Sequence, residues 1–152
     1  MPRDRFLLSA AAAAVAVSLA LPAAAGAWST QVAVGKRHAC GIGQARGNVV
    51  CWGTDVAGSL TAPSSLGAAT QVAAGWDHSC AIKKTTSRVV CWGWNYYGQS
   101  RMPASAGLSK QISAGWLHTC SVGKTSLRVT CWGQREYGQA TARRMCRRLS
   151  AW

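Results

Sequence analysis

The chain has 152 residues, one domain's worth of sequence or less, which excludes a large multidomain protein. Seventeen Lys and Arg stand against four Asp and Glu, a formal charge of +13. This balance favours either anionic surroundings or simply a charged, soluble surface, and it leaves few carboxylates for acid–base catalysis.

The N-terminal segment, residues 1–27, has the parts of a secretory signal peptide. Two arginines precede an almost unbroken apolar run over 6–21, and Ala-Gly-Ala at 25–27 offers a small-residue cleavage site. The run is short for a bilayer-spanning helix of about 20 residues, so an uncleaved anchor is the alternative. We therefore expect a secreted, extracellular product that starts at Trp28 and has no stable membrane insertion.

The remainder repeats with a period of 40 residues. Gln-Val-Ala-Val-Gly-Lys-Arg-His-Ala-Cys at 31–40 returns, modified, at 71–80 and 111–120. Residues 71–100 and 111–140 share 16 of 30 positions. Such recurrence predicts a stacked or radial repeat protein. We place the repeats at 31–70, 71–110 and 111–140, within a folded region of 28–140.

Each repeat contains a predicted β-hairpin with a cysteine on either arm. Ten residues separate the cysteines, with a polar middle and β-branched residues on both sides. If the cysteines face each other, Cys40 pairs with Cys51, His38 with Gly53 and Ala39 with Trp52, and the same pairs recur 40 and 80 residues later. Both faces of the resulting sheet are largely apolar, as expected of a sheet packed between neighbours.

Export makes disulfides the preferred state of these cysteines. Each bridge closes a loop of about a dozen residues and stabilises by roughly 3 kcal/mol on the chain-entropy model. The alternative is a zinc site of His38, Cys40 and Cys51, which lacks the usual close Cys-x₂₋₄-Cys spacing. We expect no metal. The predicted disulfide cysteines are Cys40, Cys51, Cys80, Cys91, Cys120 and Cys131.

A turn-rich stretch follows each hairpin, and Pro63 and Pro103 mark the connections to the next repeat. The third repeat has Arg143 where a proline is expected. The remaining residues, 141–152, form a basic tail that we expect to be disordered. The odd cysteine, Cys146, lies in this tail and has no predicted partner.

The motif Ala-Gly-Trp-x-His-Ser/Thr-Cys, a short hairpin, Cys-Trp-Gly and x-Tyr-Gly-Gln resembles the regulator of chromosome condensation repeat family. The resemblance covers 31–140, and it implies an all-β fold, a partial β-propeller of three blades, for which we expect four strands each. The spacing and cysteines are similar to the secreted branch, which includes propeller-type β-lactamase inhibitor proteins, and to crinkly-type receptor ectodomain repeats. A signal peptide and disulfides argue against the nuclear nucleotide-exchange role of the founding member.

Three blades do not close a seven-bladed ring, and the two end blades would present bare apolar faces. Either several chains assemble, as a homo-oligomer that completes a ring, or the sequence is a truncated copy of a longer protein. The switch to an Arg-rich ending favours truncation.

Three sets of side chains have expected roles. The histidines, two residues before a cysteine, lack a recurring carboxylate partner; we expect each to bond neighbouring backbone and cover the opposite glycine, with no catalytic residue. Trp52, Trp92 and Trp132 are expected in the core between blades. Basic residues in the hairpin turns predict a basic rim on one side of the molecule: Arg46, Lys83, Lys84, Arg88, Lys124 and Arg128.

Exposed aromatics are the best candidates for a contact surface because they dominate binding hot spots, with inter-blade packing as the alternative. They are Trp76, Trp94, Tyr96, Tyr97, Trp116 and Tyr137. We expect a secreted, non-enzymatic scaffold that binds an extracellular protein or glycan and no nucleic acid or cofactor. The alternatives are an inactive fragment of a longer seven-bladed protein, or part of a propeller enzyme whose chemistry sits in further blades.

Overall fold

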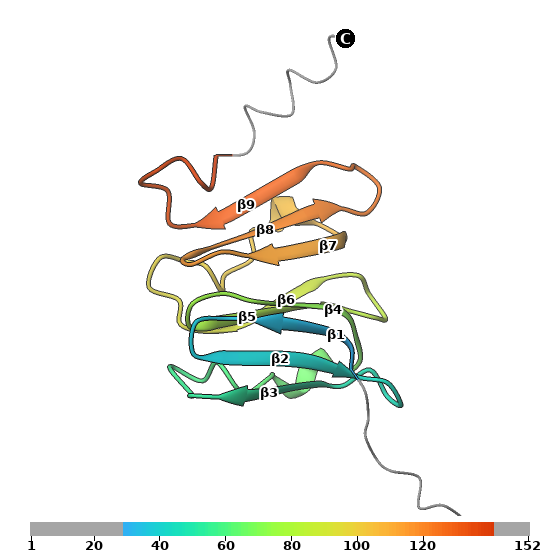
Figure 1. Cartoon of the computed structure of the whole chain (residues 1–152). Coiled ribbons are helices and arrows are strands. Elements are labelled where there is room, and N and C mark those ends of the chain that lie inside the picture. The colour runs from blue at the N-terminus through green and yellow to red at the C-terminus, as the bar shows by residue number, and fades with distance from the viewer. Residues whose placement is uncertain (1–28, 142–152) are drawn as a thin grey trace, which may run out of the picture.

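Three antiparallel β-sheets lie one above another in the computed structural model, which describes residues 29–141 (Figure 1). The expected signal peptide, the residues after Thr141 and Cys146 lie outside the described residues. Blade 1 contains β1 (Ser29–Val34), β2 (His38–Gly43) and β3 (Val49–Gly53). Blade 2 contains β4 (Ala69–Ala74), β5 (His78–Lys83) and β6 (Val89–Gly93). Blade 3 contains β7 (Ser109–Ala114), β8 (His118–Gly123) and β9 (Val129–Gly133).

The expectation of four strands per blade is wrong, because each sheet has three. In the stretch after each Cys-Trp-Gly, the backbone groups form hydrogen bonds within local turns. Examples are the bonds from Ser59 N–H to Val56 O at 3.1 Å and from Thr61 N–H to Gly58 O at 3.2 Å. Short 3₁₀ helices then begin after the two connecting prolines, η1 over Ser64–Leu66 and η2 over Ala104–Ala106. A chain that turns this often cannot extend along the outer edge of the sheet.

The predicted register of the hairpins is confirmed. Cys40 pairs with Cys51, His38 with Gly53 and Ala39 with Trp52, and blades 2 and 3 have the equivalent pairs. Disulfides join Cys40 to Cys51, Cys80 to Cys91 and Cys120 to Cys131. The structure thus has these cysteines as disulfides, in which the sulfurs are bonded to each other and are not the thiolates that a zinc ion would need.

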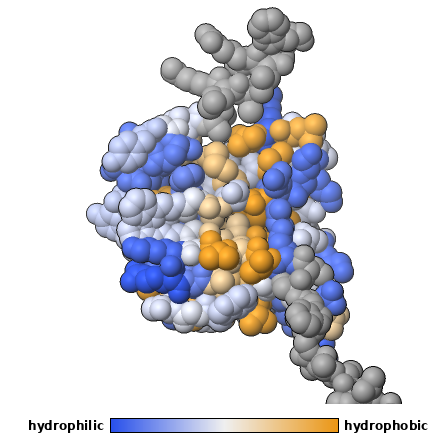
Figure 2. Space-filling model, viewed as in Figure 1, coloured by the Kyte–Doolittle hydropathy of each residue, from blue (hydrophilic) through white to orange (hydrophobic). Residues whose placement is uncertain are grey.

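The apolar core lies between the blades. We call the face toward the next repeat the forward face and that toward the preceding repeat the backward face. Cys40 and Ile42 on the forward face of blade 1 pack against Val72 and Trp92 on the backward face of blade 2. A second cluster joins blades 2 and 3 in the same way. In space-filling view, the apolar residues form a band that crosses the stack between hydrophilic sides (Figure 2).

The expected core role holds for two of the three repeated tryptophans. Trp92 and Trp132 are buried, and their indole N–H groups donate to the carbonyls of Ser59 and Gln99 in the preceding repeat, both at 2.8 Å. Trp52 is 51% exposed, which corrects the expectation. It occupies the backward face of blade 1, and no earlier blade covers that face among residues 29–141.

We predict that Trp92→Ala lowers the free energy of unfolding by about 3–5 kcal/mol, because it removes a buried indole from the inter-blade core. The matched variant Trp52→Ala should cost under about 1 kcal/mol, because half of that side chain is already in water. Denaturant unfolding of the oxidised protein measures both. Equal losses would show that burial between blades does not set the stability.

Candidate functional site

A chain of side-chain hydrogen bonds connects each blade to the next. His38 Nε2 lies 2.8 Å from Ser79 Oγ, and Ser79 Oγ donates to the carbonyl of Ser59 at 3.1 Å. Trp92 Nε1 donates to that same carbonyl. Because the hydroxyl proton goes to the carbonyl, the serine oxygen accepts from the histidine, and this requires the tautomer protonated at Nε2.

The same arrangement recurs between blades 2 and 3. His78 Nε2 lies 2.9 Å from Thr119 Oγ1, which donates to the carbonyl of Gln99 at 3.0 Å, beside the bond from Trp132 Nε1. We call each set of histidine, hydroxyl, carbonyl and tryptophan a relay. The relays correct the expected histidine role, since each imidazole bonds a hydroxyl of the next blade. The ring packs over Gly35 or Gly75 at the start of its own hairpin, and not over the opposite glycine.

A histidine beside a hydroxyl is also the geometry of an activated nucleophile. Here the hydroxyl proton is committed to a backbone carbonyl, and Ser79 and Thr119 are fully buried. No substrate carbonyl reaches these oxygens. The relays therefore act in packing the blades together.

Burial lowers the pKa of both relay histidines. For His78, burial first and the charges of His38 and His118 second lower the pKa to about 4. For His38, burial lowers the pKa and the carboxylate of Asp77 opposes that shift. The Nδ1 atom of each ring is buried without a partner among the described residues, so protonation there would place an unpaired charge between two blades.

Two further contacts repeat across the blades, and the sequence analysis missed them. Gln31 Oε1 accepts from the backbone N–H of Val72 at 2.6 Å, and Gln71 Oε1 accepts from that of Ile112. Their signal was the glutamine that opens each repeat. Arg37 also donates to Asp77 at 3.0 Å, where the carboxylate is buried and the guanidinium is half exposed.

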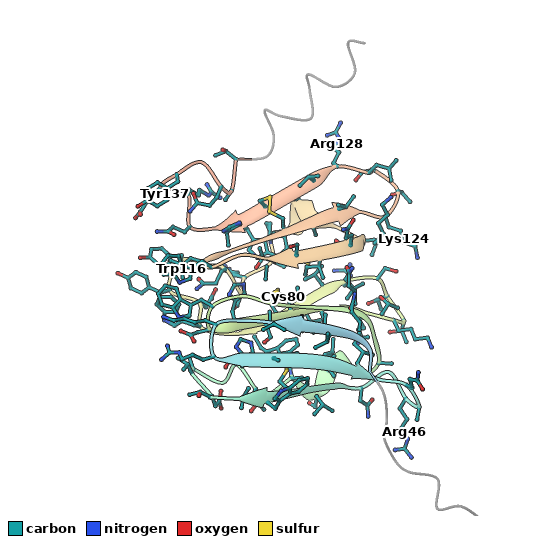
Figure 3. All side chains as sticks on the ribbon, viewed as in Figure 1. Arg46, Cys80, Trp116, Lys124, Arg128 and Tyr137 are labelled. Carbon is teal, nitrogen blue, oxygen red and sulfur yellow. A yellow bond between two sulfur atoms is a disulfide. The ribbon has the colours of Figure 1, made fainter. Side chains whose placement is uncertain are left out.

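The predicted contact residues gather at the end of the strands away from the hairpin turns. We call this surface, made of the six aromatics named above, the aromatic face. Trp116 and Tyr137 lie on one side of the molecule, and Arg46, Lys124 and Arg128 lie on the other (Figure 3). The basic turns are thus placed on one side, as predicted, and are separated from the aromatic face.

Two indoles and a lysine from equivalent repeat positions form the first part of the aromatic face. The ring centroids of Trp76 and Trp116 lie 4.0 Å apart at an interplanar angle of 35°. Lys36 Nζ lies 3.8 Å from the Trp76 ring centroid, within cation–π range. Trp116 is 61% exposed, whereas Trp76 is half-buried. Trp76 therefore serves inter-blade packing and Trp116 offers a free ring to solvent.

A tyrosine-rich loop after β6 forms the second part. Tyr96 and Tyr97 meet edge to face at 5.0 Å, and Trp94 contacts both rings. The loop is held by Ser100 N–H donating to Asn95 Oδ1 and by Tyr97 N–H donating to the side chain of Gln99, both at 2.9 Å. Tyr96 is 78% exposed on this braced loop, and Tyr137, the equivalent of Tyr97, is 87% exposed.

Neither a metal cluster nor a membrane span is present in the part of the chain that the structure describes. Within residues 29–141, no three His, Cys, Asp or Glu side chains are grouped as a metal would require. No helix in that range has the length and apolar character needed to cross a bilayer.

Three-stranded blades joined face to face in sequence define a repeat protein of the β-propeller class. Residues 69–99 match the profile of the regulator of chromosome condensation repeat. Blades 1 and 3 repeat the pattern of blade 2, so this match and the solved structures described next support the assignment of the chain to the regulator of chromosome condensation repeat family. A comparison with curated proteins found no significant match.

Solved structures share this fold. The ectodomain of the receptor kinase CR4 from Physcomitrella patens is 31% identical, with a TM-score of 0.62 over 69% of this chain and 28% of that one. The CRINKLY ectodomain of the receptor kinase ACR4 from Arabidopsis thaliana is 30% identical, with a TM-score of 0.56 over 69% of this chain and 36% of that one. Prp20p from Saccharomyces cerevisiae, 21% identical, has a TM-score of 0.58 over 74% and 32% of the two chains and shares the fold.

The chain spans about a third of the length of these structures. Three disulfides and the similarity to two receptor ectodomains indicate an extracellular protein.

We predict that the protein loses stability as the pH falls from 6.5 to 4. His78 has a lower pKa in the folded chain than in the unfolded chain, so the unfolded state binds more protons in this window. The free energy of unfolding should be highest above pH 6.5 and should fall by about 3 kcal/mol by pH 4. His78→Gln, whose amide also donates to Thr119, should flatten the dependence. An unchanged slope in denaturant titrations would contradict the assignment.

Proposed function

We propose that the chain is a secreted, non-catalytic recognition module whose aromatic face binds an extracellular protein. The observation that carries this proposal is the exposure of Trp116, Tyr96 and Tyr137 on braced loops at one end of the strands. Tyr and Trp present large contact areas at low entropic cost, and they are enriched at the centres of protein interfaces.

The polar groups beside these rings support a protein partner over a glycan. A sugar needs free hydrogen-bond donors and acceptors next to the stacking ring, since its hydroxyls must be paired. The side-chain oxygens of Asn95 and Gln99 already accept backbone N–H groups, and the Asp77 carboxylate already binds Arg37. The other oxygen of Asp77 and the amide nitrogen of Gln99 have no partner, but both atoms are buried. The exposed surface thus offers mainly the aromatic rings and the tyrosine hydroxyls.

The basic turns support no separate nucleic-acid function. Stacking platforms for bases combine aromatic and basic side chains in one groove. In this chain Arg46, Lys124 and Arg128 of the hairpin turns lie on the side opposite Trp116 and Tyr137 (Figure 3), and the basic residue stacked on an aromatic ring is Lys36, over Trp76. Their charge favours solubility and approach to anionic surfaces.

A second candidate function is that of a segment of a longer propeller without independent activity. The half-exposed Trp52 on the backward face of blade 1 favours it, together with the coverage of about a third of the similar ectodomains. In that case the aromatic face would be part of a larger surface.

The aromatic face can be tested with defined probes. The immobilised, oxidised protein would be used to select binders from a displayed random-peptide library, and in parallel it would be applied to a glycan array. We expect selected peptides to lose binding at least about tenfold in Trp116→Ala and in Tyr96→Ala, because hot-spot truncations cost 2 kcal/mol or more.

The matched controls are Arg46→Ala and Arg128→Ala on the basic side, which should leave peptide affinity unchanged. Peptides that bind equally to the aromatic variants and lose affinity in the arginine variants would contradict the proposal. Binding to glycans alone would replace the protein partner by a carbohydrate.

A further inference from the structure

The two ends of the stack expose surfaces that differ from each other. The backward face of blade 1 presents Val50, 60% exposed, beside Val32 and Trp52. The equivalent residues of blade 2, Val72, Val90 and Trp92, pack against blade 1. The forward face of blade 3 presents Val122 and Val129 beside the Cys120–Cys131 disulfide, all half-buried. Each end therefore exposes one half of the interface that is complete twice inside the chain.

The groups that form polar contacts between the blades also recur at the two ends of the stack, with one partner of each contact at each end. Gln31 and Gln71 accept from a backbone N–H of the next blade. The side chain of Gln111, the third in this series, has no partner within residues 29–141, and the backbone N–H of Val32 occupies the equivalent position in blade 1. The carbonyl of Gln139 in turn occupies the position of the Ser59 and Gln99 carbonyls, which receive a tryptophan N–H.

The aromatic stack repeats the same logic. Lys36 of blade 1 covers Trp76 of blade 2, and Trp76 contacts Trp116 of blade 3. The face of the Trp116 ring that points away from Trp76 is free. In blade 1, the residue equivalent to Trp116 is Lys36. A second chain placed as a following blade would set its Lys36 against Trp116 and repeat a cation–π pair.

We propose that the forward face of blade 3 binds the backward face of blade 1 in a second copy of this chain. The joint continues the two interfaces already present between the blades. It is a head-to-tail contact, which closes into a ring when the rotation permits. Two copies supply six blades, within the usual range of four to eight, whereas three copies supply nine. The expected assembly is therefore a dimer.

The proposed joint lacks two contacts of the inner interfaces. Blade 1 has Ala39 where blades 2 and 3 have the relay hydroxyls of Ser79 and Thr119. The imidazole of His118 would therefore meet a methyl group in the second copy. Arg37 of that copy would meet Leu117, and not an acid like Asp77. The joint should be weaker than the inner interfaces and reversible with concentration.

The head-to-tail geometry is tested by two variants that each block one end. We expect Val50→Arg and Val129→Arg, each alone, to have the mass of one chain by light scattering. An equimolar mixture should recover the mass of two at higher concentration, through the one joint that carries neither arginine. Thr85→Arg is the control, since Thr85 is exposed in the hairpin turn of blade 2, the blade that takes no part in the joint. Free-thiol counts and near-ultraviolet circular dichroism verify that each variant is folded.

A wild-type protein that stays monomeric at its highest soluble concentration would overturn the proposal. A dimer that persists in one of the two arginine variants would also overturn it. A symmetric contact between two like faces would be disrupted by only one of the two substitutions, whereas the proposed joint is disrupted by either. The aromatic-face proposal is tested separately by peptide binding to Tyr96→Ala, because Tyr96 follows blade 2 and lies outside the joint, whereas Trp116 would be covered by Lys36 of the second copy.

A gain-of-function variant provides the second test. Ala39→Ser supplies the hydroxyl missing from the joint and should tighten the dimer by about 2- to 10-fold per joint, the net effect of one buried hydrogen bond. The gain should vanish in the His118→Ala background. An unchanged dissociation constant, or a gain in dimer affinity that persists without His118, would contradict the proposed position of His118 opposite residue 39 of the second copy.

Discussion

Blade 2 and blade 3 each direct two hydrogen-bond donors to one backbone carbonyl of the preceding repeat, and the stack depends on this contact. The Ser59 carbonyl accepts from Ser79 and Trp92, and the Gln99 carbonyl accepts from Thr119 and Trp132. A carbonyl has two lone pairs, so the arrangement satisfies it fully in a buried setting. The histidine of the preceding blade donates a hydrogen bond to the hydroxyl oxygen. The contact therefore fixes the register between blades, while the disulfides fix the register within them.

The position of the aromatic face follows from this register. Because equivalent residues are brought above one another, positions 36, 76 and 116 form one row, with Lys36 against Trp76 and Trp76 against Trp116. The tyrosine loop after β6 is anchored at its base by Gln99, whose carbonyl belongs to the relay and whose side chain holds Tyr97. The groups that unite the blades thus also present the exposed rings, which connects the stability of the stack with its proposed recognition role.

Much of the fold was predictable from the sequence because a pairing assumed in one repeat can be checked against the other two. One assumption, that Cys40 faces Cys51, placed His38 opposite Gly53 in all three copies, and the structure confirms it. Two expectations failed because they concern a neighbour and not a local pattern. Trp52 has the same local sequence as Trp92, but no preceding blade covers it among residues 29–141, and the histidines bond hydroxyls 41 residues away. The expected fourth strand of each blade is absent because the residues that would form it make hydrogen bonds within local turns.

Amide hydrogen exchange, resolved by residue, tests the central claim that each blade is stable because of its neighbours. Blade 2 is buried on both faces and takes part in both relays, so its strand β5 should exchange most slowly, ahead of β2 and β8. The terminal blades should open first, even though each retains its own disulfide. Equal protection in all three blades, or fastest exchange in β5, would show that the hairpins are stable alone and would contradict the account.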